Sequence, residues 1–364
     1  MELKKYKLGE ILDVTRGASL SGEFYAAEGE YVRLTCGNFD YQNNCFKENK
    51  AKDNLYYIGD FKPDFLMKEG DIITPLTEQA IGLLGSTAII PESGKYIQSQ
   101  DVAKIVCKEH LLNKDFAFYL ISSNLVKQQL SAAAQQTKIR HTSPDKIKDC
   151  IVWIPELEEQ KRIGKLLRTI DLKIELNRQL NHNLEAMAKQ LYDYWFVQFD
   201  FPDENGKPYK SSGGKMVWDK RLKREIPLLW KAKIVEEVAD VYNGATPSTV
   251  NELNYGGDIV WITPKDLSDQ KQKFVYQGER NISQVGYDSC STHLLPSNTI
   301  LMSSRAPIGL LAIAKTELCT NQGFKSFVSK SKNIATYLYY YLQYHITQIE
   351  QLGTGTTFNS CIYN

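Results

Sequence analysis

The sequence predicts an α+β protein in which two similar domains are joined by one long helix. Three observations support this fold class. The stretch from Pro155 to Phe199 holds a single glycine and no further proline, and its apolar residues recur in sevens. The segments before and after it resemble each other at a separation of 222–228 residues. Within both segments, short β-branched runs alternate with Gly, Pro, Asn and Asp, which is typical of strands joined by turns.

The first domain is expected over residues 1–154. Its strands are predicted at Tyr31–Thr35, Asp71–Thr74 and Ala88–Ile90, and an aromatic-rich helix at Lys114–Leu130. Such a mixture of strands with a closing helix predicts an α+β domain.

The long helix is expected over residues 155–199. Pro155 suits the first helical turn, and the glutamates after it favour the positive end of the helix dipole. About 40 helical residues span about 60 Å. An ordinary core helix is the alternative, but such helices run only about 8–20 residues. A coiled-coil-type helix is therefore the preferred interpretation.

The heptad pattern predicts a seam on this helix that needs a partner helix. Asn177 interrupts it and resembles the single polar residue that fixes register in coiled coils. The predicted seam and partner-binding residues are Ile163, Leu166, Ile170, Asn177, Leu180, Leu184, Met187 and Leu191.

A basic connector over residues 200–230 is expected to be a loop, because it contains Asn-Gly and Gly-Gly turn signals. From Asn205 to Lys233 there are nine basic and two acidic residues, a local balance of +7. A solvated loop and a phosphate-facing surface are both compatible with this charge.

The second domain is expected over residues 231–364 and repeats the first. KLGEILDVTRGAS at 7–19 aligns with IVEEVADVYNGAT at 234–246, and IGLL recurs unchanged at 81–84 and 308–311. Gln100 aligns with Gln322. Matches in the same order along the chain indicate an internal duplication.

Composition excludes several classes of protein. The 364 residues carry a net charge of +1, and the seven cysteines are scattered without any CxxC, which argues against a disulfide framework or a zinc site. The five histidines lack metal-ligand spacing. Neither a run of transmembrane length nor the apolar core of a signal peptide is present, so a cytoplasmic protein without membrane contact is expected.

Catalytic motifs are weak, and a non-enzymatic protein is expected. The sequence has no GxxxxGK[ST] phosphate loop and no Asn-Pro-Pro-Tyr methyltransferase motif. Pro144-Asp145 followed by Glu159-Gln160-Lys161 is similar to a nuclease pattern. Its second half lies on the first turn of the long helix, where it is not expected to meet Asp145.

The segments IPELEEQKRI and LYDYWFVQFDFPDENGKPYK, with the duplicated domain around them, resemble the DNA-specificity subunit of type I restriction–modification systems. The resemblance implies two target-recognition domains, each reading one half of a split site in double-stranded DNA. It implies a helical spacer that docks two methyltransferase subunits, with restriction subunits completing the complex. S-adenosylmethionine, ATP and magnesium are then expected on these partners, and no cofactor on this chain.

The sequence departs from the family at its end. The first copy continues from its last loop into a strand and the long helix, whereas the second ends at GTGTTFNSCIYN. We therefore expect an incomplete second domain and no second helix. A truncated gene, a recombination product and a subunit completed by another chain are the alternatives, the first two being preferred. Self-association through the unpaired helix is expected.

Direct readout of bases requires polar side chains on elements that reach the grooves, and phosphate contacts require basic or hydroxyl groups. In the first copy the candidates are Arg16, Arg33, Asn38, Thr77, Gln79, Lys138, Arg140 and His141. In the second copy they are Thr246, Ser248, Lys265, Asp266, Ser303, Ser304, Arg305, Asn321 and Gln322. No catalytic and no metal-binding residue is expected.

Two other functions remain open from the sequence. One is a coiled-coil interaction protein whose repeated domains bind protein instead of DNA. The other is a truncated fragment that is inactive alone and donates recognition sequence. Binding that falls steeply with salt and requires a split sequence distinguishes DNA recognition from the first of these.

Overall fold

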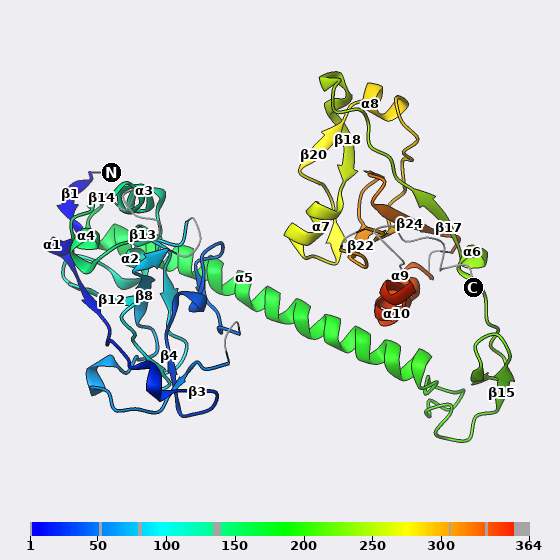
Figure 1. Cartoon of the computed structure of the whole chain (residues 1–364), viewed down its shortest axis with the longest axis horizontal. Helices are drawn as coiled ribbons and strands as arrows, with labels where there is room; N and C mark the ends of the chain where they lie inside the picture. The colour runs from blue at the N-terminus through cyan, green and yellow to red at the C-terminus, as the bar shows by residue number, and fades with distance from the viewer. Residues whose placement is uncertain are drawn as a thin grey trace. The chain divides into compact units, whose positions relative to one another are not determined.

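The computed structural model describes residues 2–50, 53–78, 82–133, 140–305, 307–331 and 334–352. The chain forms two compact units, Met1–Leu180 and Asn181–Asn364, and the helix α5 (Leu157–Tyr192) runs from the first into the second (Figure 1). The α+β fold with two domains joined by a long helix is thus confirmed.

Two four-stranded sheets form most of unit 1. The first has the order β10-β8-β12-β2 and is antiparallel throughout. Its strands are β10 (Ala88–Ile89), β8 (Ile72–Pro75), β12 (Val102–Cys107) and β2 (Leu12–Arg16). The second has the order β11-β4-β7-β3, with strands β11 (Tyr96–Ile97), β4 (Tyr31–Arg33), β7 (Tyr56–Tyr57) and β3 (Tyr25–Ala26).

Smaller elements complete unit 1. Paired short strands are β1 (Lys4–Lys7) with β14 (Ile151–Ile154), β9 (Thr77–Glu78) with β13 (Arg140–His141), and β5 (Phe39–Asp40) with β6 (Cys45–Phe46). Helices are α1 (Leu8–Ile11), α2 (Lys114–Ile121), α3 (Asn124–Ala133) and α4 (Pro144–Lys148), with 3-10 turns at Gly22–Phe24, Cys36–Asn38 and Pro63–Phe65. The single helix expected at Lys114–Leu130 is broken: Ser122 ends α2, and its hydroxyl donates back to the carbonyl of Phe118.

The beginning of α5 is fixed to unit 1 by a buried glutamine. Gln160 is 1% exposed, and its amide nitrogen donates to the carbonyls of Leu111 and Pro155 while its amide oxygen accepts from the backbone of Asn113. Gln160 of the nuclease-like pattern Glu159-Gln160-Lys161 therefore serves in packing. The helix has 36 residues and continues as a π-helical turn at Asp193–Val197, close to the expected bounds.

Unit 2 repeats the first sheet of unit 1. Its order β22-β21-β24-β17 matches β10-β8-β12-β2, with β19 added at the edge. The strands are β22 (Leu311–Ala314), β21 (Ile300–Ser303), β24 (Phe324–Ser329), β17 (Ala239–Asn243) and β19 (Phe274–Val275). A second sheet contains β20 (Arg280–Ile282), β18 (Tyr255–Ile262) and β23 (Cys319–Thr320). The internal duplication is therefore visible in the topology.

The helices of unit 2 are short, and the longest of those described is α9 (Ile334–Tyr344) with 11 residues. The others described are α6 (Val235–Val238), α7 (Pro264–Gln270), α8 (Gln284–Asp288) and α10 (Ile346–Leu352), with a 3-10 turn at Glu252–Asn254. Tyr192 of α5 is buried beside Leu338, Tyr339 and Tyr340 of α9, which fixes the end of α5 to unit 2.

The connector is folded, in contrast to the loop expected from its composition. Strand β15 (Met216–Asp219) pairs antiparallel with β16 (Arg224–Pro227), and the ring of Trp230 stacks on that of Phe201 with centroids 5.0 Å apart. Aromatic packing and a hairpin outweigh the local turn signals.

Candidate nucleic-acid interface

In each unit a Gly-Ala motif follows a strand, and the loop that contains it is hydrogen-bonded to a second loop. In unit 1 the amide of Ala18 donates to the carbonyl of Gln98 at 3.0 Å, and in unit 2 that of Ala245 donates to Thr320 at 3.0 Å. A Cβ atom on Gly17 would lie 2.3 Å from the carbonyl oxygen of Gln98. Only glycine permits this approach, so the duplicated Gly-Ala motif marks a duplicated contact between loops.

The paired loops of unit 1 gather five polar residues. Arg16 donates from Nε to the carbonyl of Gln100 at 2.9 Å, and Thr77 Oγ1 donates to Asp101 at 3.4 Å. Thr77 Oγ1 also lies 3.3 Å from Nδ1 of His141, through the pairing of β9 with β13. Arg16, Thr77 and His141 were predicted from the sequence, and the structure brings them together.

The corresponding loops of unit 2 gather a similar group. Thr246 Oγ1 hydrogen-bonds to Oε1 of Gln322, and the amide of Ser304 donates to the carbonyl of Gly323 at 2.7 Å, which places the exposed Arg305 beside them. The bond from Ser304 corresponds to that from Leu76 to Asp101 in unit 1, at 2.8 Å. Ser248 is exposed two residues beyond Thr246.

These two groups, defined here as cluster 1 and cluster 2, have chemistry suited to nucleic acid. Arginine and glutamine form bidentate hydrogen bonds with purine edges, and threonine and histidine can contact bases or phosphate. Cluster 1 contains Arg16, Thr77, Gln100, Asp101 and His141, and cluster 2 contains Thr246, Ser248, Arg305, Asn321 and Gln322.

Gln100 and Asp101 were missing from the residues predicted for the first copy. The alignment of Gln100 with Gln322 was a signal that could have identified Gln100, since its counterpart was chosen. Asp101 had no comparable signal, because its place beside Thr77 depends on the pairing of loops far apart in sequence.

Two predicted residues of unit 1 belong to the interior, which corrects their assignment as base readers. Arg33 is 8% exposed, its guanidinium lies 3.8 Å from the centre of the Tyr25 ring, and it donates to the carbonyl of Asn54. Asn38 is 1% exposed and accepts from the backbone of Thr35. Their polar groups stabilise the fold instead of facing solvent.

Three predicted residues of unit 2 are also buried. Asp266 accepts from the backbone and hydroxyl of Thr263 and from the backbone of Glu279. Ser303 is 0% exposed and donates to the carbonyl of Pro307, and Ser304 is 4% exposed. Side-chain hydrogen bonds in a cap and a turn explain Asp266 and Ser303, and burial alone removes Ser304 from the surface, so the three are not available to read bases.

The remaining predicted residues are either exposed, part of cluster 2, or outside the described residues. Lys265 is exposed and forms an ion pair with Glu279 at 2.8 Å, and Asn321 accepts from the amide of Gly323 within cluster 2. Gln79 and Lys138 lie outside the described residues. The backbone of Arg140 pairs with Glu78, but its side chain lies outside the description, so its role stays a prediction.

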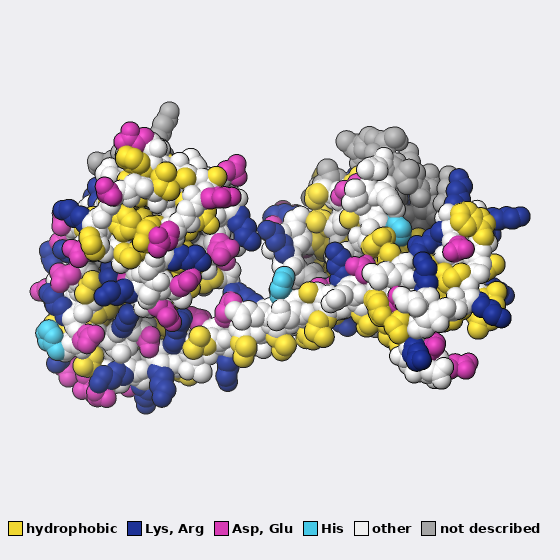
Figure 2. All heavy atoms as spheres, turned by 90° about the horizontal axis from the view of Figure 1, so that it is seen from below, with side chains coloured by type: hydrophobic (Ala, Val, Ile, Leu, Met, Phe, Trp, Pro, Cys, Tyr) yellow, Lys and Arg dark blue, Asp and Glu magenta, His cyan; other side chains and the backbone are white. Residues whose placement is uncertain are grey.

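Most of the predicted seam of α5 is exposed within the described part of the chain. Leu166 is 61% exposed, Leu180 and Leu184 are 52% and Met187 is 64%. Figure 2 shows a row of hydrophobic side chains along the helix. Ile170, Asn177 and Leu191 are also exposed, whereas Ile163 is half-buried against unit 1. A row of apolar residues this long indicates a binding surface.

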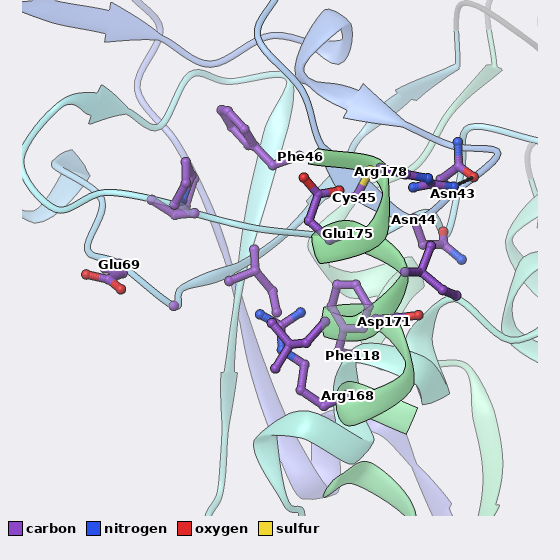
Figure 3. Close-up of a pocket in the computed structure, with 16 residues that line it drawn as sticks. Asn43, Asn44, Cys45, Phe46, Glu69, Phe118, Arg168, Asp171, Glu175 and Arg178 are labelled. Atoms are coloured by element: carbon purple, nitrogen blue, oxygen red, sulfur yellow. Dashed lines mark hydrogen bonds between the residues drawn. The ribbon is translucent and has the colours of Figure 1, made fainter. Parts of the chain in front are cut away.

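A cavity of about 470 Å³ lies within unit 1 between α5 and the loop around Asn43 (Figure 3). Arg178 donates to the side chain of Asn43 at 2.7 Å, and Asp171 accepts from the hydroxyl of Tyr119 at 2.6 Å. Burial and the neighbouring Asp171 raise the pKa of Tyr119, so the phenol remains a donor. These bonds attach α5 to unit 1, and the cavity follows this junction.

Over the described residues, the structure contains no cluster of three or more His, Cys, Asp or Glu that could hold a metal ion. No helix in that part of the chain is both long and apolar enough to cross a membrane.

Comparison with known proteins agrees with the duplicated architecture. The family model for the type I restriction modification DNA specificity domain matches residues 1–186 and 227–362. The MjaIX specificity subunit of Methanocaldococcus jannaschii is 39% identical over 150 residues, covering 40% of this chain but only 35% of that protein. The HindI specificity subunit of Haemophilus influenzae is 24% identical over 404 residues, covering 97% of this chain and 85% of the relative.

A solved structure shows the same fold. The type I restriction–modification S subunit of M. genitalium aligns with a TM-score of 0.58 at 15% identity, covering 96% of this chain and 79% of that one. The family model matches both copies of the duplicated domain. The chain therefore belongs to the type I restriction–modification DNA specificity family.

Proposed function

We propose that cluster 1 and cluster 2 each read one half of a split site in double-stranded DNA. The repeated loop contact carries this proposal: Gly17 and Gly244 allow the same close approach, and it gathers Arg16 and Gln100 in one unit and Thr246 and Gln322 in the other. Two similar scaffolds carrying different side chains suit two different half-sites.

In this proposal the chain recognises the DNA sequence, and the partner subunits carry out methylation and cleavage. In this proposal a methyltransferase subunit supplies S-adenosylmethionine-dependent methylation in the cytoplasm, and a restriction subunit supplies ATP- and magnesium-dependent cleavage. The exposed seam of α5 supports docking of such partners, because Leu180, Leu184 and Met187 present apolar surface along consecutive turns. Two methyltransferase subunits dock on each chain in the assembled complex.

The experiment that tests the reading role uses Arg305→Ala in the complex with the methyltransferase subunit. Binding to a duplex containing the site is expected to weaken by about 1–3 kcal/mol, the range for a lost base contact. The matched control is Arg280→Ala, since Arg280 is exposed on β20 and its guanidinium lies over the Tyr255 ring. Equal affinity of Arg305→Ala and the unsubstituted protein would remove Arg305 from cluster 2's reading surface.

A further inference from the structure

The basic connector is a rigid platform. The ring of Phe201 lies between those of Tyr209 and Trp230, with centroids 4.8 and 5.0 Å away. The hydroxyl of Tyr209 donates to the carbonyl of Lys215 at 2.8 Å, just before the β15–β16 hairpin. The backbone that carries the basic side chains of this segment is therefore held in place by packing and hydrogen bonding.

Three aspartates of the connector accept hydrogen bonds from its own backbone amides. Asp200 accepts from the amide and hydroxyl of Ser211 at 2.7 and 2.6 Å, and Asp219 accepts from the amides of Arg221 and Leu222 at 2.9 Å. Asp203 accepts from the amide of Lys207 at 2.8 Å. These acids shape turns and do not pair with the basic side chains around them.

The basic side chains are correspondingly available. Within the described residues, eight exposed cations of the connector have no ion pair or side-chain hydrogen bond: Lys207, Lys210, Lys215, Lys220, Arg221, Lys223, Lys231 and Lys233. Arg224 differs, because it donates to the carbonyl of Val197 at 2.8 Å and lies over the ring of Phe199. Arg224 therefore fixes the hairpin to the end of the long helix, whereas Lys220, Arg221 and Lys223 at the tip of the hairpin are exposed to solvent.

The positive charge of the chain is concentrated in this segment. Residues 205–233 contain nine basic and two acidic residues, a balance of +7. The rest of the chain has 35 basic and 41 acidic residues, a balance of −6. A nearly neutral protein that binds a polyanion needs such a local concentration of charge.

We propose that this surface, residues 205–233, contacts the phosphate backbone of DNA without reading its sequence. This inference rests on the proposed function and adds a contact outside clusters 1 and 2. Lysine predominates among the free cations, and lysine is depleted in protein–protein interfaces but common in phosphate contacts. The family model leaves residues 187–226 unmatched, so most of this surface is separate from the duplicated domain.

The test neutralises the tip of the hairpin with Lys220→Gln, Arg221→Gln and Lys223→Gln in the full chain bound to its methyltransferase subunit. Binding to duplexes with and without the recognition site is measured over a salt series. Each lost phosphate contact lowers the slope of log K against log salt by about 0.9, so the triple variant is expected to lower it by about 2.7. Affinity falls for both duplexes, and the preference between them is retained.

Two control variants make the result specific. Lys62→Gln, Lys68→Gln and Lys189→Gln remove three exposed lysines elsewhere and should leave the slope unchanged. Lys220→Arg, Arg221→Lys and Lys223→Arg keep the charge and should restore the original slope. A loss in the first triple variant that this charge-keeping variant does not rescue would indicate damage to the hairpin and overturn the proposal.

The remaining outcomes separate this inference from the proposed function. An unchanged slope in the neutral variant overturns the phosphate contact, whether or not association with the methyltransferase subunit falls; a fall would assign the surface to a protein partner. A lowered slope in a complex that shows no preference for any site would support the phosphate contact and contradict the reading role. Absence of all DNA binding would contradict both.

Discussion

Arg16 donates a hydrogen bond from Nε to the backbone carbonyl of Gln100 at 2.9 Å, across 84 residues of sequence. In unit 2 the counterpart of Gln100, Gln322, hydrogen-bonds to Thr246 three residues after the end of β17. The same pair of loops is thus joined through different side chains. We infer that the duplication preserved the scaffold while the exposed groups diverged.

The loop contact predicts a strong effect of a small substitution. Gly244→Ala should destabilise unit 2 by about 3 kcal/mol, at the upper end of the usual range for single substitutions, because its Cβ would lie 2.2 Å from the carbonyl oxygens of Thr320 and Asn321. Chemical denaturation measures the change in the free energy of unfolding. Gly22→Ala is the control, since its Cβ would meet nothing closer than 3.9 Å. Equal stability of the two variants would show that the loops can separate.

The seam of α5 predicts a loss of assembly without a loss of folding. Leu184 is 52% exposed, so Leu184→Lys should change the free energy of unfolding by less than about 0.5 kcal/mol. Co-purification with the methyltransferase subunit should fall sharply, because a charge would enter an apolar interface. Asn183→Lys adds the same charge one position earlier and serves as control. Unaltered assembly of Leu184→Lys would exclude this seam as the docking surface.

Lys273 links α5 to the rest of unit 2, so its removal is expected to weaken that attachment. Its ammonium group donates to Glu185 at 2.9 Å and to the hydroxyl of Tyr340 at 2.5 Å. Lys273→Met should destabilise unit 2 by about 1–3 kcal/mol, since the carboxylate loses its cation. The exposed Lys271→Met is the matched control. In a double-mutant cycle with Glu185→Gln, the two losses should be less than additive, and full additivity would mean that the residues do not interact.

The connector predicts a dependence on pH. The hydrogen bonds from Ser211 hold the pKa of Asp200 below its usual value. A depressed pKa in the folded state means that the stabilisation is present above about pH 3.9, the ordinary value, and is lost as the pH falls through the folded pKa. Fluorescence of Trp230 should therefore report acid unfolding of the connector, and Asp200→Asn should remove that transition. An identical acid transition in the variant would assign it to another group.

The sequence predicted the fold well because the main signals are local. The apolar heptads after Pro155 predicted α5, and the repeated KLGEI and IVEEV segments predicted the second unit. The connector was predicted as a loop because its glycines are local turn signals, whereas the stacking of Phe201 on Trp230 joins residues 29 apart. The break of the helix at Ser122 was also not predicted, although its cause is local. The serine hydroxyl donates to the carbonyl of Phe118 and so competes with the backbone for that acceptor.

The candidate site was predicted only in part. Arg16 and Thr77 of the first copy and Gln322 of the second were chosen from the sequence, and the structure gives each a hydrogen bond to a segment far away in the chain. Their role in reading DNA stays a prediction. Residue type alone could not separate exposed polar groups from those that cap turns. Arg33, Asn38 and Ser303 are buried with their hydrogen-bonding groups satisfied, which depends on tertiary packing that composition does not show.

The most direct test maps methylated adenines in a host that expresses this chain with its methyltransferase subunit. A split motif with two unlike halves is expected. Arg305→Ala should relax the bases of one half alone, and Arg16→Ala those of the other. A palindromic motif, or a motif in which both substitutions relax the same half, would contradict the claim that each cluster reads its own half-site.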